Sequence, residues 1–126
     1  MKELIKEFMA LKVFAVIGAS SNIEKYGYKI FKNLLSRGYR VYPVNSGLNE
    51  LDGVKCYKSL SEISDKIDVV DIVVPPKITE EIVKECKKLG LTRVWMQPGA
   101  ESKQAIEFCN KNGIKVVHDA CVMMNY

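Results

Sequence analysis

Val13-Phe14-Ala15-Val16-Ile17-Gly18-Ala19-Ser20 is the stretch of sequence that decides the fold. Its five apolar residues, rich in β-branched types, predict a strand that is buried on both faces in a parallel sheet. Gly18 allows a sharp turn and has no Cβ to keep a ligand away. We expect a helix to begin near Gly27, with its free N–H groups and positive dipole end directed at the loop. This arrangement is typical of a phosphate-binding site.

Strand and helix patterns alternate along the rest of the chain. Strands are expected at residues 13–17, 39–44, 53–57, 68–74, 92–96 and 114–117. Helices are expected near the N-terminus, at 27–38, and briefly after Ser59. A fourth helix is expected to end at Gly90, with Ile78, Ile82, Cys86 and Leu89 as its buried face, and a fifth to end at Gly113. The alternation predicts an α/β fold, a doubly wound parallel sheet in three α/β/α layers. The expected strand order is the 53–57 edge strand, the second strand, the first, and then the three later strands, in one domain of residues 1–126.

Composition and charge exclude several classes of function. The chain has 126 residues, 48% of them hydrophobic, and a net charge of +4 without a dense basic run, so no nucleic acid is expected as a partner. No apolar run approaches the roughly 20 residues that cross a bilayer, and no signal peptide is apparent, so we expect a cytoplasmic protein without a membrane partner. The apolar segment 122–126 is expected to pack on the sheet or on a neighbouring subunit, in a monomer or a homodimer.

The four cysteines are expected to be free thiols, because their spacing matches neither a zinc site nor a thioredoxin motif. Cys86 and Cys109 fall on apolar helix faces and are expected in the core. Cys121 follows the last strand and is a possible redox thiol, with an inert packed cysteine as the alternative. His118 is interpreted as structural, because no nucleophile motif accompanies it and the side chain of Asp119 should point away along an extended chain. No catalytic or metal-binding residues are predicted.

In a sheet of this kind, ligands bind beyond the carboxyl ends of the strands, where the strand order reverses. A dinucleotide fingerprint G-x-G-x-x-G would need glycines at positions 20 and 23, where this chain has Ser20 and Ile23. It would also need an acidic residue at the end of the second strand, where Asn45 stands. An amide tolerates a phosphorylated ribose, whereas a carboxylate would repel it. NAD is therefore the second choice of ligand.

Several short motifs, in this order and spacing, resemble the small stand-alone CoA-binding proteins, which are similar to the CoA-binding domain of the succinyl-CoA synthetase alpha subunit. The motifs are 16–20 (VIGAS), 25–28 (KYGY), 38–45 (GYRVYPVN), 68–71 (DVVD), 74–76 (VPP) and 95–100 (WMQPGA). The resemblance covers residues from about 12 to the end and implies a Rossmann-like fold that binds coenzyme A.

The resemblance also implies a role for each part of the expected site. The loop Gly18-Ala19-Ser20 and the following helix start would hold the pyrophosphate, and Val44 and Asn45 would pack beside the adenosine. Val74-Pro75-Pro76 would line the path of the pantetheine arm, and Gln97 and Pro98 would border the thiol.

Three further residues are candidates with less defined roles. The family often has Pro and a basic residue after Val-Asn, whereas this chain continues with Ser46-Gly47-Leu48, so Lys25 or Arg40 is the candidate for binding the 3′-phosphate. Tyr28 lies on an apolar helix stripe and is either a core residue or a ligand contact.

These observations favour a non-catalytic protein that binds CoA or a short acyl-CoA as a carrier, sensor or regulator. Two alternatives remain open: an NAD(P)-binding oxidoreductase or redox sensor, and a subunit that supplies the CoA site of a larger acyl-CoA-handling complex.

Overall fold

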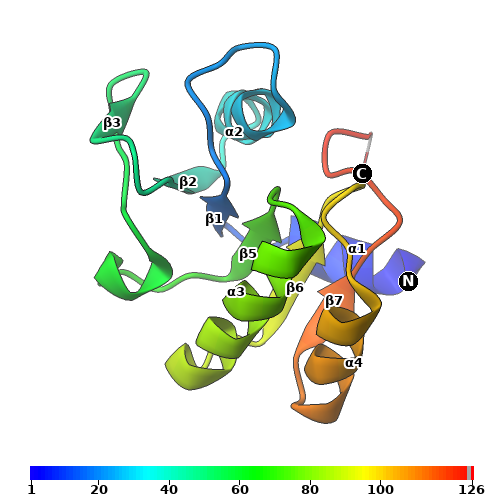
Figure 1. Ribbon diagram of the computed structural model, residues 1–126. Helices are drawn as coiled ribbons and strands as arrows, with labels where there is room; N and C mark the ends of the chain where they lie inside the picture. Colours follow the sequence, from blue (N-terminus) through cyan, green and yellow to red (C-terminus); the bar gives the residue numbers. More distant parts are fainter. Residues whose placement is uncertain (125) are drawn as a thin grey trace.

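The computed structural model describes residues 1–124 and 126 and has a parallel sheet between two layers of helices (Figure 1). The sheet has five strands in the order β2-β1-β5-β6-β7. The strands are β1 (Val13–Ile17), β2 (Arg40–Val44), β5 (Val69–Ile72), β6 (Arg93–Met96) and β7 (Lys115–Val117). The strand order reverses at β1, which pairs with β2 on one side and with β5 on the other. The doubly wound α/β fold is thereby confirmed.

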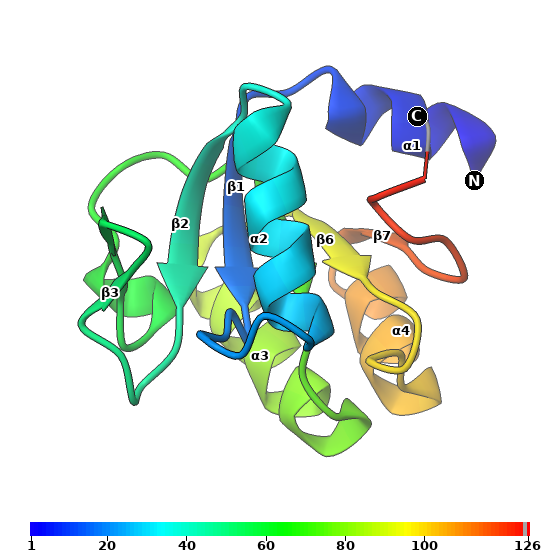
Figure 2. The same ribbon diagram turned by 90° about the horizontal axis from the view of Figure 1, so that it is seen from above.

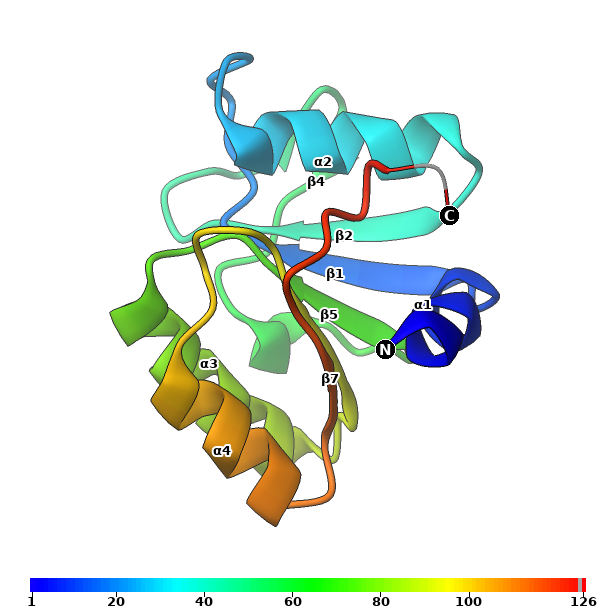
Figure 3. The ribbon, with the colours of Figure 1, turned by 90° about the vertical axis from the view of Figure 1, so that its right-hand side faces the viewer.

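The helices divide between the two faces of the sheet. They are α1 (Lys2–Met9), α2 (Tyr26–Ser36), α3 (Pro76–Leu89), α4 (Lys103–Lys111) and the 3₁₀ turn η1 (Leu60–Glu62). In Figure 3 the sheet is seen nearly edge-on, with α2 above it and α3 and α4 below. No helix among residues 1–124 and 126 is long and apolar enough to cross a membrane.

The core consists of two clusters, one on each face, because successive strand residues point to opposite sides. Phe14, Val16 and Trp95 belong to the cluster under α1 and α2, which also contains Phe8 and Phe31. The opposite cluster, under α3 and α4, contains alternate strand residues and the helix residues that cover them, among them Ala15, Ile17, Val70, Ile72, Val83 and Met96. All four residues of β5 are buried, as expected of a central parallel strand, and they include the carboxyl group of Asp71.

The expected edge strand at residues 53–57 is wrong in part. The chain forms a separate two-stranded hairpin of β3 (Glu50–Leu51) and β4 (Val54–Lys55), seen beside the main sheet in Figure 2. Asp52 and Gly53 turn this hairpin with φ values of 50° and 82°, as expected for an Asp-Gly turn that needs two left-handed residues. Tyr57 pairs with the main sheet through an isolated parallel bridge to Val44.

The expected buried face of α3 is also wrong by about one residue. Its buried residues are Thr79, Val83 and Cys86, whereas Ile78 is 47% exposed. Cys86 is buried as expected, Leu89 is exposed, and Ile78 and Ile82 line a pocket that is described below.

Candidate functional site

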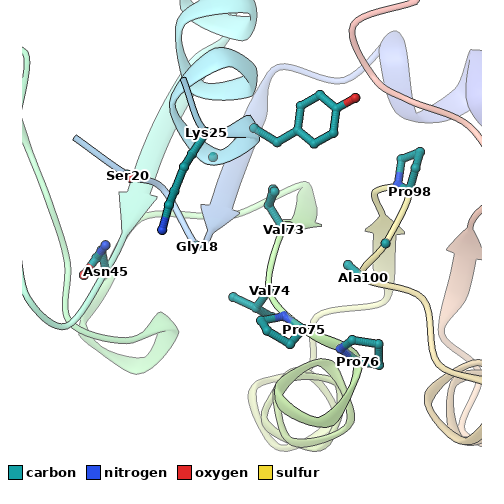
Figure 4. A pocket seen from close by; sticks show the side chains of 13 residues that line it. Gly18, Ser20, Lys25, Asn45, Val73, Val74, Pro75, Pro76, Pro98 and Ala100 are labelled. Carbon is teal, nitrogen blue, oxygen red and sulfur yellow. The ribbon is translucent and has the colours of Figure 1, made fainter. Parts of the chain in front are cut away.

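The main cleft opens at the carboxyl ends of β1, β5 and β6 and has a volume of about 560 Å³. Drug-sized ligands commonly occupy sites of about 300–1,000 Å³. In Figure 4 the Lys25 side chain extends from the start of α2 toward Gly18 and Asn45, and the proline segments lie across the cleft. The cleft is lined by Gly18, Ser20, Lys25, Tyr26, Gly27, Asn45, Val73, Val74, Pro75, Pro76, Pro98, Gly99 and Ala100.

Two glycines allow the close packing at the floor of this cleft. Gly18 has a φ of 95°, and a Cβ there would lie 2.6 Å from the carbonyl oxygen of Val73. A Cβ on Gly27 would lie 2.0 Å from the carbonyl oxygen of Gly18. Gly27 thus performs the task of the third glycine in a dinucleotide fingerprint, which is close packing of helix on strand, but after a longer loop. The sequence pattern predicts Gly27 at the helix start but does not predict this contact with Gly18.

The loop between β1 and α2 is held by its own side chains and leaves the helix start open. The Ser20 Oγ accepts a hydrogen bond from the Asn22 N–H over 3.0 Å, and the Asn22 Oδ1 accepts one from the Glu24 N–H over 3.0 Å. Lys25 occupies the N-cap of α2, and no side chain caps this end. The first N–H groups of a helix lack partners within the helix, so this end presents donors and a partial positive charge beside the Lys25 ammonium.

The start of α3 has the opposite character, although it borders the same cleft. Pro75 is its N-cap and Pro76 its first residue. Proline has no N–H, so two of the donors that a helix start normally offers are absent here. An anion is therefore favoured at α2, and an apolar chain is favoured along Val74, Pro75 and Pro76.

Asn45 connects the end of β2 to the loop after β1. Its Nδ2 donates to the Ala19 carbonyl oxygen over 2.7 Å, and its Oδ1 accepts from the Gly47 N–H over 2.8 Å. The position needs one donor and one acceptor, which an amide supplies and an ionised carboxylate does not. This geometry gives a second physical reason for Asn rather than Asp at the end of β2.

A second pocket, the side pocket, has a volume of about 330 Å³ and shares Gly18, Asn45 and Val74 with the main cleft. Val44, which the family resemblance predicts to pack beside the adenosine, lies in the lining of this pocket. Its other lining residues were not predicted as site residues; they are Ile17, Ser46, Lys58, Ser59, Leu60, Ile78, Ile82 and Glu85. Because three residues are shared, the two pockets are neighbouring parts of one site.

Four predicted site residues lie outside both linings. Arg40 begins β2, at the end of the sheet opposite the cleft, where it pairs with Asp65 at 3.3 Å, so the prediction that it binds the 3′-phosphate is wrong. Ala19 is fully buried in the core under α2. The Tyr28 hydroxyl donates to Asp52 Oδ2 over 2.7 Å, a contact that raises the pKa of Tyr28 and lowers that of Asp52. Tyr28 therefore packs at the core edge.

Gln97 is the fourth, and it is buried beneath the cleft floor. Its Nε2 donates to Asp71 Oδ1 over 2.6 Å, and its Oε1 accepts from the Val122 N–H over 3.0 Å. Asp71 is fully buried, and its Oδ2 has no hydrogen-bond partner among the described residues. Burial raises the pKa of Asp71 to about 7, and the Gln97 hydrogen bond opposes this rise. Gln97 thus connects β5 to the C-terminal segment, a role that replaces the expected contact with a thiol.

Ala120, Val122 and Met123 of the C-terminal segment pack on the sheet, which is one of the two expected arrangements; residue 125 lies outside the described residues. The Trp95 Nε1 donates to the Ala120 carbonyl oxygen over 2.8 Å, and an Arg37 N–H donates to the Val122 carbonyl oxygen over 2.8 Å. These bonds hold residues 120–122 over the face that α1 and α2 also cover.

The cysteines are free thiols, three buried and Cys121 half-buried. Burial raises the pKa of Cys86 to about 12 and that of Cys109 to about 11, so both remain protonated core residues. Cys121 lies outside both pocket linings.

His118 and Asp119 do not point apart, contrary to expectation. The Nδ1 of His118 lies 2.6 Å from Asp119 Oδ2, because Asp119 has a left-handed φ of 59° that turns its carboxylate back. Neither residue lines the cleft.

Comparison with known proteins identifies the family. The chain matches the CoA binding domain model over residues 12–126. It is 35% identical to the alpha subunit of an ADP-forming acetate–CoA ligase II from Pyrococcus furiosus, over 94% of this chain but only 28% of the length of that subunit.

Two solved structures are similar over nearly their whole length. A conserved hypothetical protein from Pyrococcus furiosus is 42% identical with a TM-score of 0.87, and the match covers 90% of this chain and 97% of that one. A hypothetical protein from Pyrococcus horikoshii OT3 is 37% identical with a TM-score of 0.90, covering 97% of this chain and 86% of that one. With the family model matched over residues 12–126, this chain belongs to the CoA-binding domain family, whose fold resembles that of succinyl-CoA synthetase.

Proposed function

We propose that the protein binds CoA or a short acyl-CoA across the main cleft and the side pocket, and that it does so without catalysing a reaction. The observation that carries this proposal is the contrast between the two helix starts that border the cleft. One has open donors and a lysine, and the other has two prolines. CoA has the matching asymmetry, with a charged diphosphate joined to a long, nearly neutral pantetheine arm.

Each part of the ligand has a matching part of the site. The diphosphate would lie at the start of α2, beside Ser20 and Lys25. The pantetheine arm would follow Val74, Pro75 and Pro76, with the thiol near Pro98. The adenosine would occupy the side pocket next to Val44.

The composition of the main cleft favours binding over catalysis. Its described lining contains a serine and a lysine but no histidine, cysteine or carboxylate. In acyl transfer to CoA the CoA sulfur is the nucleophile and a nearby base takes its proton, and these lining residues include no histidine or carboxylate that could be this base. A CoA bound here would therefore be held, and its thiol would react elsewhere.

An NAD(P)-binding protein is less compatible with these contacts. In a dinucleotide site, the carboxylate at the end of the second strand accepts hydrogen bonds from the ribose hydroxyls. Here Asn45 stands in place of the carboxylate, and one amide N–H and one lone pair of its oxygen are already used on Ala19 and Gly47.

Thermal unfolding in the presence of CoA, NADH or NADPH tests the proposal. A ligand that binds only the native state, at about 100 times its Kd, raises the free energy of unfolding by about 2.7 kcal/mol. We expect CoA to raise Tm and the two nicotinamide nucleotides to leave it unchanged. Stabilisation by a nicotinamide nucleotide but not by CoA would contradict the proposal.

A pair of lysine variants makes the test specific for the site. Lys25→Gln removes the charge at the cleft, whereas Lys29→Gln removes one from the same helix outside the cleft. We expect CoA affinity to fall about tenfold in the first variant, as for one lost charge-assisted hydrogen bond, and to stay unchanged in the second.

The lengths of the relatives favour a second candidate function, that of a CoA-site subunit. The matched region is only 28% of the length of the ligase alpha subunit. This chain would then supply the CoA site to a larger acyl-CoA-handling assembly. Copurification with a larger protein from native extract would favour this candidate over a free carrier.

A further inference from the structure

We infer that Lys58 recognises the 3′-phosphate of CoA and so lets the protein distinguish CoA from dephospho-CoA, an inference that rests on the proposed function. Lys58 is a lining residue of the side pocket. Lys25 is the corresponding cation of the main cleft, and these two are the only lysine or arginine residues in the described linings of the two pockets. One cation therefore serves each of the two anionic groups of the ligand.

The isolated bridge between Tyr57 and Val44 brings Lys58 to the end of β2. The Tyr57 N–H donates to the Pro43 carbonyl oxygen, and the Asn45 N–H donates to the Tyr57 carbonyl oxygen, both over 2.9 Å. Lys58 is thereby fixed next to Asn45 although it is 13 residues further along the chain. In nucleotide-binding sheets of this type, the end of the second strand faces the ribose, and a basic residue nearby accommodates a ribose phosphate.

The Lys58 side chain reaches the loop that follows β2. Its Nζ donates to the Leu48 carbonyl oxygen over 3.2 Å and to Asn49 Oδ1 over 3.1 Å. These are uncharged acceptors, and no carboxylate among residues 1–124 and 126 forms an ion pair with this ammonium. An ammonium has three N–H donors, so one donor and the full charge remain for a phosphate oxygen. The segment after β2 has no basic residue of its own at 46–49, and Lys58 supplies one from a later part of the chain.

Other cations near this end of the sheet are engaged elsewhere. Lys32 pairs with Asp52 at 3.3 Å, and Lys55 lies over the Tyr57 ring at 4.9 Å. Arg40 lies at the opposite end of β2.

The acidic residue of the side pocket lies on α3. Ile78, Ile82 and Glu85 follow one another at helical spacing and line the pocket together. The adenine ring, with its amino donor, fits this apolar and acidic α3 face, whereas the phosphate is repelled by Glu85 and fits the Lys58 side.

Calorimetric titration of CoA and of dephospho-CoA, which differ only by the 3′-phosphate, tests this inference. The wild-type protein should bind CoA about tenfold more tightly, the effect of one charge-assisted hydrogen bond. In Lys58→Gln the CoA affinity should fall to that of dephospho-CoA, whereas dephospho-CoA binding should change less than about twofold. Lys58→Arg keeps the positive charge and should retain the preference for CoA over dephospho-CoA. If Lys58 had only a structural role, the preference would not depend on this charge.

Two matched variants distinguish this role from general electrostatics. Lys25→Gln should weaken both ligands equally and leave their ratio unchanged, since both contain the diphosphate. Lys55→Gln, on the neighbouring β4, should change neither affinity.

The failures of the two proposals are separable. If neither CoA nor dephospho-CoA binds the wild-type protein, the proposed function is wrong. If both bind with equal affinity, or if Lys58→Gln keeps the preference for CoA, CoA binding stands and the role of Lys58 is wrong.

Discussion

Gly27 illustrates how a single residue can determine the shape of the site. It lies in the first turn of α2, where helix propensity alone predicts that Gly27→Ala stabilises the protein by up to about 1 kcal/mol. The 2.0 Å approach of a Cβ to the Gly18 carbonyl oxygen predicts the opposite. A backbone atom cannot move aside as a flexible side chain would, so the steric effect decides the sign.

We expect Gly27→Ala to lower the free energy of unfolding by about 1–3 kcal/mol, the usual range for overpacking. Denaturant unfolding measures this change, with Gly47→Ala as the control. A Cβ on Gly47 would meet only the Asn45 Oδ1, at 3.4 Å, so this control should stay within about 0.5 kcal/mol of wild type. A stabilised Gly27→Ala variant would mean that α2 can shift away from β1 freely.

At the scale of the element, α3 has two apolar surfaces with different tasks. Val83 is fully buried against the sheet, and Ile78 lines the side pocket while 47% exposed. Periodicity alone does not separate them, because a residue that faces a ligand site and one that faces the core can recur at the same helical spacing.

The two surfaces predict opposite results for a matched pair of substitutions. Val83→Ala should cost about 2 kcal/mol of stability through the cavity it leaves, and CoA affinity should stay within about twofold. Ile78→Ala should change stability by less than about 0.5 kcal/mol but weaken CoA binding by roughly fivefold, as for about 1 kcal/mol of lost apolar contact. Denaturant unfolding and calorimetric titration of both variants check this pair. The reverse pattern would mean that Ile78 belongs to the core.

At the scale of the whole molecule, Asp71 links the centre of the sheet to the C-terminal segment through Gln97. Its carboxyl pKa, raised by burial to about 7, lies well above the ordinary value near 3.9. Between these two pH values the native state retains a proton that the unfolded state releases. Stability should therefore fall as pH rises, and this fall should end above about pH 7.

We expect the free energy of unfolding to decrease between pH 5 and 7 by up to about 1.4 kcal/mol per pH unit. Glu7 and Asp52 have lowered pKa values, so their contributions have the opposite sign and lie below this range. Asp71→Asn keeps an acceptor for Gln97 but cannot titrate, so it should remove this decrease in the free energy of unfolding with pH. Denaturant titrations at several pH values measure the free energy of unfolding. If its decrease with pH persists in the variant, another titratable group causes the decrease.

Much of the architecture follows from the sequence, because the fold depends on local patterns. The apolar run at 13–17 and its glycine predict β1, the turn and the position of the cleft. Arg40 could also have been excluded, since the first residue of a parallel strand lies at the edge of the sheet opposite the ligand. The prediction that Arg40 binds the 3′-phosphate was wrong because it considered only the charge of the side chain and not the direction of the strand that carries it.

Other parts of the site depend on contacts between distant segments and could not be predicted. The Asp52-Gly53 turn detaches the expected edge strand, and only the Tyr57 bridge then brings Lys58 beside Asn45. Gln97 follows a strand end, as ligand residues do, but its side chain points to Asp71 beneath the cleft floor. No local pattern separates these outcomes.

The prolines at the start of α3 also have a consequence for any enzyme that works with this protein. In the proposed binding mode, the open donors of α2 and the prolines of α3 would let a bound CoA lie in only one direction, with its nucleotide end toward β2 and its sulfur toward β6. On this proposal, a catalyst that loads or unloads the sulfur would approach beside Pro98, whereas one that approaches over the hairpin of β3 and β4 would meet the nucleotide end of CoA.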